Sequence, residues 1–278
     1  MRDENIAVRA DFHMHTEFSG DSDAPVRTML DAALERGMEA VCITDHIDVD
    51  YPEDGKTGVN PFLFDLDEYF RVLDGIKKEY AGRLDLRIGV ELGLQPHLGE
   101  RYRSLVGHYP FDFVIGSLHV IHGMDPYDGI IFEGRSDRDV YREAFQATLE
   151  NLDQVKDFDV LGHIDYVVRY GRHQAREYSY RSFSDEIDMI LKKVIGMGKG
   201  IEMNMGGFKY GLGFCNPHPD VIRRYRELGG EIITVGADAH RPEHVAYDFE
   251  KAGDILKSCG FRYYTEYRNR KPVFKQLG

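Results

Sequence analysis

Two histidines stand one residue apart near the start of the chain, in the stretch DFHMHTEFSGDSD (residues 11–23). Because alternate residues of a strand point to the same face, His13 and His15 would present two imidazoles side by side at a strand end. Paired imidazoles are common ligands of zinc and related transition metals. The carboxylates that follow, among them Asp21, could add an oxygen ligand. Taken alone, the stretch fits a pair of hydrogen-bonded structural histidines equally well.

Residues of the same kinds recur where later apolar runs of the sequence end. The candidates are His46 after the second run, Glu91 after the third, His119 after the fourth, His163 after the fifth, and Asp238 and His240 after the seventh. In a β/α barrel the C-terminal ends of the strands lie on one rim, so these side chains would converge. Random placement would instead scatter histidines through helices and loops.

The number of candidate ligands bears on the number of ions. A catalytic zinc site uses about three protein ligands and keeps one position open. Six histidines together with Asp21, Glu91 and Asp238 are too many for one ion and suit two or three. Glu91 stands among histidines and could bridge two ions through its two oxygens. Clustered divalent ions hydrolyse phosphate esters by polarising phosphoryl oxygens and by generating hydroxide near neutral pH.

Apolar runs that alternate with segments of helical period must position these residues. The expected strands are Val8–His13, Ala40–Thr44, Leu84–Glu91, Phe111–Val120, Val160–Ile164, Gly200–Asn204 and Glu231–Ala237. The expected helices are Pro25–Gly37, Asp65–Tyr80, Asp137–Lys156, Phe183–Met197, Pro217–Leu228 and Ala246–Cys259. This alternation predicts a parallel sheet with helices outside it, and the length fits a closed (β/α) barrel of typically ~250 residues. An open doubly wound sheet is the alternative, weakened because no Gly-rich phosphate loop follows an early strand.

The end of the chain, residues 261–274, predicts one or two final strands with a turn near Asn269. No linker, repeat or low-complexity segment interrupts the pattern. The composition, with 42% hydrophobic residues, is that of an ordinary globular protein. We therefore expect one domain spanning residues 1–278.

Charge and cysteine content limit the classes of function. No run of about 18 apolar residues is present, so no membrane span is expected. The N-terminal segment MRDENIAVRADF is charged and lacks a signal-peptide core. The three cysteines, Cys42, Cys215 and Cys259, are far apart, which favours free thiols in a reducing compartment and hence the cytoplasm. A net charge of −13 opposes nucleic-acid binding, although small anions can bind where metal cations line a pocket.

The motifs in this order, HxH, TDH, a third-strand Glu, SxH, GH and a late DxH, resemble the PHP (polymerase and histidinol phosphatase) superfamily over nearly the whole chain. The stretches VELGLQPHL (90–98), FDFVIGSLHVIHG (111–123) and GGFKYGLG (206–213) look like the stand-alone histidinol-phosphate phosphatases of that family. The resemblance implies a distorted (β/α)7 TIM-like barrel and a trinuclear metal centre. It also implies hydrolysis of L-histidinol phosphate to L-histidinol and phosphate, in histidine biosynthesis, by a metal-bound hydroxide.

Carried over residue by residue, the resemblance implies three metal sites. The first would use His13, His15, Glu91 and Asp238, and Glu91 would bridge to a second site completed by His119 and His163. The third would use His46 and His240. Many relatives have a further histidine where this chain has Asp21, so occupancy of the third site is open. Zinc, manganese and iron all suit such ligands.

Other polar residues near the strand ends are candidates for roles around the metals. Besides Glu91, we consider Asp45, Asp165 and His122 as donors of a proton to the leaving group or as groups that orient the ligands. Arg169, Arg172 and Lys209 could engage phosphate, and His97 could contact substrate. Glu202 and Asn204 could either stabilise the barrel interior or touch substrate.

Three other readings remain. The same scaffold could act on a nucleotide or sugar phosphate, or as a 3′–5′ exonuclease, although the net charge disfavours the exonuclease. It could be a non-catalytic metal-binding module, although only the Asp21 position departs from the family pattern. A metal-dependent amidohydrolase commonly needs a carboxylated lysine, and no lysine stands at the relevant strand ends. We expect a small phosphorylated substrate, no nucleic acid and no membrane, and leave the oligomeric state open.

Overall fold

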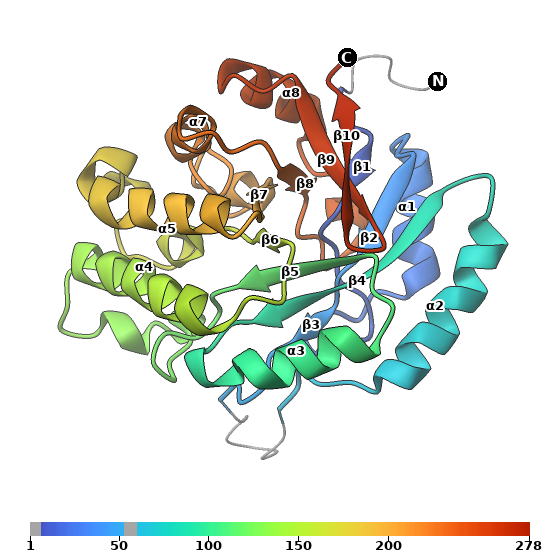
Figure 1. Cartoon of the computed structure of the whole chain (residues 1–278), viewed down its shortest axis with the longest axis horizontal. Helices are drawn as coiled ribbons and strands as arrows, with labels where there is room; N and C mark the ends of the chain where they lie inside the picture. The colour runs from blue at the N-terminus through green and yellow to red at the C-terminus, as the bar shows by residue number, and fades with distance from the viewer. Residues whose placement is uncertain (1–6, 53–59) are drawn as a thin grey trace.

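The protein is described here by a computed structural model covering residues 7–52 and 60–278. Within those ranges, seven strands pair in parallel and helices surround them (Figure 1). In spatial order the strands are β1 (Ala10–Asp11), β2 (Ala40–Ile43), β4 (Asp85–Gly93), β5 (Phe113–Ser117), β6 (Val160–Leu161), β7 (Gly200–Asn204) and β8 (Ile233–Gly236). A short strand β3 (His46–Ile47) also pairs with β4.

The sheet closes on itself between its first and last strands. The backbone N–H of Phe12 donates to the carbonyl of Val235 (2.9 Å), and that of Asp238 donates to the carbonyl of His13 (2.8 Å). An open sheet would leave these edges unpaired. The predicted α/β barrel of the TIM-like (β/α)7 type is therefore confirmed.

Eight α-helices lie in the described part of the chain. They are α1 (Val26–Glu35), α2 (Leu66–Tyr80), α3 (Gly99–His108), α4 (Asp137–Gln154), α5 (Ser184–Gly196), α6 (Gly206–Lys209), α7 (Pro219–Glu227) and α8 (Phe249–Ser258). Helix α2 shows why such segments form where they do. The carboxylate of Asp65 accepts the N–H groups of Asp67 and Glu68, and a buried stripe at spacings of three and four residues faces the sheet.

Helix α3 is an element that the sequence pattern does not predict. It buries only Gly99 and Tyr102, so its amphipathic signal is weak. The strand predicted over Phe111–Val120 is also shorter, since β5 ends at Ser117. The residues after Ser117 leave the ladder and carry His119 to the rim.

A two-stranded antiparallel hairpin packs against the N-terminal ends of several barrel strands. It consists of β9 (Tyr263–Arg268) and β10 (Lys271–Gln276), joined at Asn269 and Arg270, which both have positive φ. The carbonyl of Tyr267 accepts Arg87 Nε of β4 (3.1 Å), and its ring lies 4.9 Å from that of Phe113. The prediction of final strands with a turn near Asn269 is thus confirmed.

The hydrophobic residues between sheet, helices and hairpin form one continuous core cluster. No helix within 7–52 and 60–278 has the length and apolar character required to cross a bilayer. Phe113, which has no exposed surface, contacts both Phe12 (ring centroids 5.5 Å apart) and Tyr267. It therefore connects the first barrel strand, the barrel interior and the hairpin.

We predict that Phe113→Ala lowers the free energy of unfolding by about 3–5 kcal/mol, because it removes a buried ring and leaves a cavity. Urea unfolding at fixed metal concentration measures this. Phe274→Ala, at a position that is 48% exposed, is the matched control and should change stability little. A loss for Phe113→Ala no larger than the control's would contradict the role given to this residue.

Candidate metal centre

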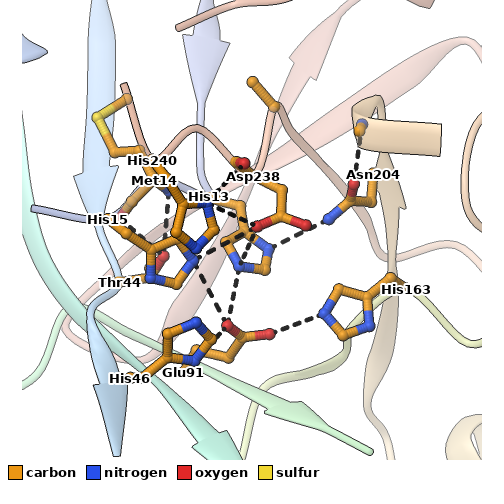
Figure 2. A network of polar contacts seen from close by, with 12 residues as sticks. His13, Met14, His15, Thr44, His46, Glu91, His163, Asn204, Asp238 and His240 are labelled. Carbon is orange, nitrogen blue, oxygen red and sulfur yellow. Dashed lines mark hydrogen bonds and ion pairs between the residues drawn. The ribbon is translucent and has the colours of Figure 1, made fainter. Parts of the chain in front are cut away.

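The nine predicted metal ligands converge at the C-terminal rim of the barrel. Figure 2 shows several of them around the carboxylate of Glu91. Glu91 lies within β4, His46 within β3, and the remaining ligands follow strand ends or lie in the loops beyond: His13, His15, Asp21, His119, His163, Asp238 and His240. Residues more than 200 positions apart in the sequence thus come within a few ångströms of one another.

Glu91 is fully buried, and its two oxygens face different groups of imidazoles. Oε1 lies 2.9 Å from His163 Nε2 and 3.2 Å from His119 Nε2. Oε2 lies 3.1 Å from His13 Nε2 and 3.1 Å from His46 Nδ1. A carboxylate in this arrangement can bridge two cations.

His13, His15 and Asp238 form a compact group beside Glu91 Oε2. Asp238 Oδ1 lies 3.7 Å from His13 Nε2 and 3.5 Å from His15 Nε2, and His15 Nε2 lies 3.5 Å from Glu91 Oε2. Two ligand atoms of one tetrahedral zinc ion lie roughly 3.3 Å apart, given bonds of 2.0–2.1 Å. The donor spacing therefore suits a single ion of that kind.

Asp21 reaches the outer part of the cluster. Its Oδ2 lies 3.0 Å from His240 Nε2 and 3.6 Å from His46 Nε2, and its side chain is 40% exposed. The rings of His46 and His240 both stack on His15, at 4.2 and 4.1 Å between centroids. Asp21 thus places an oxygen donor beside His46 and His240.

Unpaired polar atoms at the centre test whether this donor set fits a metal. Four buried ligand atoms have no hydrogen-bond partner among the described residues: His13 Nε2, His15 Nε2, His46 Nδ1 and Glu91 Oε2. Burying polar atoms without a partner costs free energy, so their convergence indicates that another group completes the site. Imidazole nitrogens and carboxylate oxygens are the donors that zinc, manganese and iron accept.

The electrostatics of the cluster favour bound cations. Burial opposes charge on His13, but the carboxylates of Glu202, Glu91 and Asp238 outweigh it and raise the pKa of His13 well above its usual value. Burial likewise opposes charge on Glu91, yet the surrounding imidazoles hold the pKa of that carboxyl well below its usual range. The carboxylates therefore favour a proton on His13 at a place where a metal ion could bind instead, so metal binding there would release a proton.

Three residues outside the ligand set orient the ligands. Glu202 Oε1 lies 2.6 Å from His13 Nδ1, Asp48 Oδ2 lies 2.8 Å from His119 Nδ1, and Ser19 Oγ lies 3.2 Å from His15 Nδ1. A proton held on each Nδ1 leaves the Nε2 lone pair for a metal. No sequence pattern predicts the roles of Asp48 and Ser19, because their contacts depend on how loops return to the rim.

Gly236, at the end of β8, allows β8 to pack closely against β1. A Cβ atom there would lie 2.3 Å from the His13 Cβ and 2.6 Å from Glu202 Oε1. The close approach of β8 to β1 therefore requires a residue without a side chain. Two residues later, Asp238 takes a left-handed backbone with φ of 54°, a conformation that aspartate tolerates better than most residues.

Asp45 and Asp165 are buried and act through neighbouring residues. Asp45 accepts the backbone N–H of Thr16 (2.6 Å) and the hydroxyl of Ser19 (2.7 Å), which in turn contacts His15. Burial raises the pKa of Asp45 to about 6. Asp165 accepts Asn216 Nδ2 (2.5 Å) and the N–H of His218 (2.8 Å). Neither residue lines the cavity described below.

Three predicted site residues lie away from the cluster, which corrects their expected placement. His122 is held by two carboxylates of α4, Glu143 at 3.0 Å and Glu150 at 3.3 Å. Arg172 donates to the carbonyl of Phe132 (3.0 Å), and His97 pairs with Asp50 (2.9 Å). None of the three lines the cavity over the ligands, and local partners hold their side chains.

A cavity of about 300 Å³ opens over the ligands, and Arg169 lines it. This guanidinium is buried and donates to Asn216 Oδ1, Asp238 Oδ2 and Asn204 Oδ1, each at 2.9 Å. Lys209 lies nearby and donates to the backbone carbonyl of Asp238 (2.8 Å), and burial lowers its pKa.

Aromatic residues that the sequence did not single out form much of the remaining wall. They are Tyr51, Phe62, Tyr127, Tyr166, Tyr170 and Tyr210, together with the carboxylate of Asp125. Most come from irregular loops, where hydrophobic periodicity gives no guidance.

Glu202→Gln should weaken metal affinity about 10–100-fold, as loss of a residue that orients a ligand typically does. Glu202 also accepts the backbone N–H of His163 (3.0 Å), so an amide nitrogen there would face a second donor. Metal content after dialysis against a graded chelator measures the change. Glu79→Gln, an exposed residue paired with Arg27, is the control. Equal metal retention by both variants would contradict this role.

Comparison with known proteins shows which family this chain resembles. A family model described as the PHP domain matches residues 11–206. A probable histidinol-phosphatase of Clostridium acetobutylicum is 31% identical over 264 residues, which are 95% of this chain and 95% of that protein. A histidinol-phosphatase of Lactococcus lactis is 28% identical over 95% of this chain and 96% of its own length.

A solved structure extends the likeness to the fold. The crystal structure of a Lactococcus lactis histidinol phosphate phosphatase, complexed with zinc, L-histidinol and phosphate, matches with a TM-score of 0.86 at 28% identity. The match covers 95% of this chain and 98% of that one. The resemblance read from the motifs is confirmed, and the chain belongs to the PHP domain family.

Proposed function

We propose that this chain hydrolyses L-histidinol phosphate to L-histidinol and phosphate, with two or three divalent ions held at the rim. The observation that carries the proposal is the buried carboxylate of Glu91, whose two oxygens face separate groups of histidines. Divalent ions at such a centre polarise the phosphoryl group and activate water for attack. The relatives named as histidinol-phosphatases support the choice of substrate.

The ligands divide into three groups in this proposal. His13, His15, Glu91 and Asp238 would hold the first ion, and Glu91, His119 and His163 would hold the second. His46, His240 and Asp21 would hold a third. Zinc is the ion bound by the Lactococcus lactis structure, and manganese and iron suit the same donors.

Arg169 binds the phosphate in this proposal. A guanidinium carries five N–H donors, and Asn216, Asp238 and Asn204 use three of them. Two donors remain for an anion in the cavity that Arg169 lines. Asp165 contributes by holding Asn216, and Asp45 by holding Ser19, so we assign both aspartates to positioning and not to proton transfer.

Three buried cysteines without disulfide partners suit the reducing cytoplasm that we propose for this enzyme. The class of substrate is a small phosphorylated molecule, which the size of the cavity also fits.

Glu91→Ala should lower phosphate release from L-histidinol phosphate by more than the roughly 10–100-fold lost with a residue that only orients a ligand. Removing the bridge leaves the imidazoles on both sides without their shared carboxylate. The measurement is phosphate release by metal-loaded protein, with bound metal determined in parallel. Glu100→Ala, on the exposed face of α3, is the control.

The wild-type protein tests the substrate itself. It should release phosphate from L-histidinol phosphate faster than from AMP or fructose bisphosphate, and a chelator should stop the reaction. Faster hydrolysis of either competitor would reassign the substrate. Full activity in metal-free protein, or in Glu91→Ala, would contradict the proposed metal-dependent mechanism.

Arg169→Lys should raise KM for L-histidinol phosphate about tenfold or more, because lysine keeps the charge but lacks the planar pair of donors. Inhibition by inorganic phosphate should weaken in parallel. Arg172→Lys is the matched control, since Arg172 contacts the carbonyl of Phe132 outside the cavity. Unchanged phosphate inhibition in Arg169→Lys would remove this residue from the phosphate site.

A further inference from the structure

One carboxylate in the cavity wall has no role in holding the metals. Five acidic residues line the cavity, of which Asp21, Glu91 and Asp238 are metal-ligand candidates. Asp48 Oδ2 contacts His119 Nδ1 and so already has a partner. The remaining one, Asp125, contacts none of the ligand histidines at ion-pair distance in the described part of the chain.

Two neutral donors hold Asp125 in place. The backbone N–H of Tyr127 donates to Oδ1 (2.8 Å), and the hydroxyl of Tyr51 donates to Oδ2. The residue is 8% exposed, and no lysine, arginine or histidine of residues 7–52 and 60–278 lies within 4 Å of its carboxylate. Burial raises the pKa of Asp125, as expected for a carboxylate lacking a cationic partner. Asp125 is therefore a fixed acceptor whose charge is not balanced by an ion pair.

Aromatic residues share the cavity wall with this carboxylate. Tyr51 packs edge-on against Phe62 (4.6 Å between centroids), and Tyr170 packs edge-on against both Tyr127 (5.9 Å) and Tyr166 (5.1 Å). All five line the same cavity as Asp125. Organic cations are attracted to aromatic faces and to carboxylates, so this wall suits a positively charged group.

The cavity thus has two chemically different parts. The metal ligands and Arg169 attract the phosphate of a substrate, while Asp125 and the tyrosines favour a cation. L-histidinol phosphate carries both kinds of group. At neutral pH its primary amine is protonated, whereas an unperturbed imidazole is mostly neutral. The amine is therefore the better partner for Asp125.

We propose that Asp125 determines substrate specificity by binding the ammonium group of the amino-alcohol part of the substrate, with Tyr51 holding the carboxylate in place. This inference rests on the proposed function. It assigns recognition of the leaving alcohol to Asp125. Binding of the phosphate group remains assigned to the metals and Arg169.

The variant Asp125→Asn tests the proposal with two substrates. Asparagine keeps the oxygen that accepts the Tyr127 N–H, removes the charge, and places an amide nitrogen toward the Tyr51 hydroxyl, whose oxygen can accept a hydrogen bond from it. The second substrate is 3-(imidazol-4-yl)propyl phosphate, which lacks the amino group and is otherwise the same molecule. Asp128→Asn is the matched control, because Asp128 lies three residues away, is exposed and does not line the cavity.

The wild-type protein and Asp128→Asn should prefer L-histidinol phosphate over the deamino substrate by about tenfold or more in kcat/KM, through KM, since a charge-assisted hydrogen bond is involved. Asp125→Asn should lose most of this preference and retain its metal content. If Asp125→Asn discriminated as well as the wild type, the proposal would be overturned. A wild-type protein that hydrolyses neither imidazole substrate would instead overturn the proposed function, and this inference with it.

Discussion

A charged carboxylate without any exposed surface is costly unless neighbouring cations compensate it. Glu91 is in that position, with four imidazole nitrogens within 3.2 Å of its two oxygens. Protons on His13, His46 and His119, whose pKa values are raised, supply part of this compensation, and divalent ions would supply more. The requirement explains why histidines from several separate strands must reach one point, and why unpaired ligand atoms face one another there.

The closure of the barrel and the assembly of the site depend on the same few residues. His13 accepts the backbone N–H of Asp238 where β1 meets β8, and both side chains point to the ligand cluster. The strand pairing therefore fixes the separation of the ligands. Gly236 permits that pairing because any side chain there would overlap with His13 and Glu202. A change that loosened the seam between first and last strands would displace two candidate ligands together.

Positioning residues extend outward from the ligands in short chains. Asp45 holds Ser19, which contacts His15, and Asp165 holds Asn216, which contacts Arg169. Such chains limit how far the imidazole of His15 or the guanidinium of Arg169 can rotate. The metal-ligand side of the cavity is thus densely hydrogen-bonded at the strand ends, whereas the aromatic wall with Asp125 comes from residues outside the barrel strands.

From the amino-acid sequence alone one can predict the alternation of strands and helices, the barrel, and the convergence of the nine predicted ligands. Apolar runs report strands locally, and the ends of parallel strands must share a rim. Helix α3 escaped prediction because it buries too few side chains to leave a periodic pattern. The folded structure was needed to learn which oxygen of Glu91 faces which histidine. It was also needed to find that Asp48 and Ser19 contact the predicted ligands, and that Asp125 and the tyrosines line the cavity. It also placed His122, Arg172 and His97 outside, although their sequence positions resemble that of Arg169. These features could not be predicted because loop paths and side-chain directions follow from packing between distant segments, which no local sequence pattern encodes.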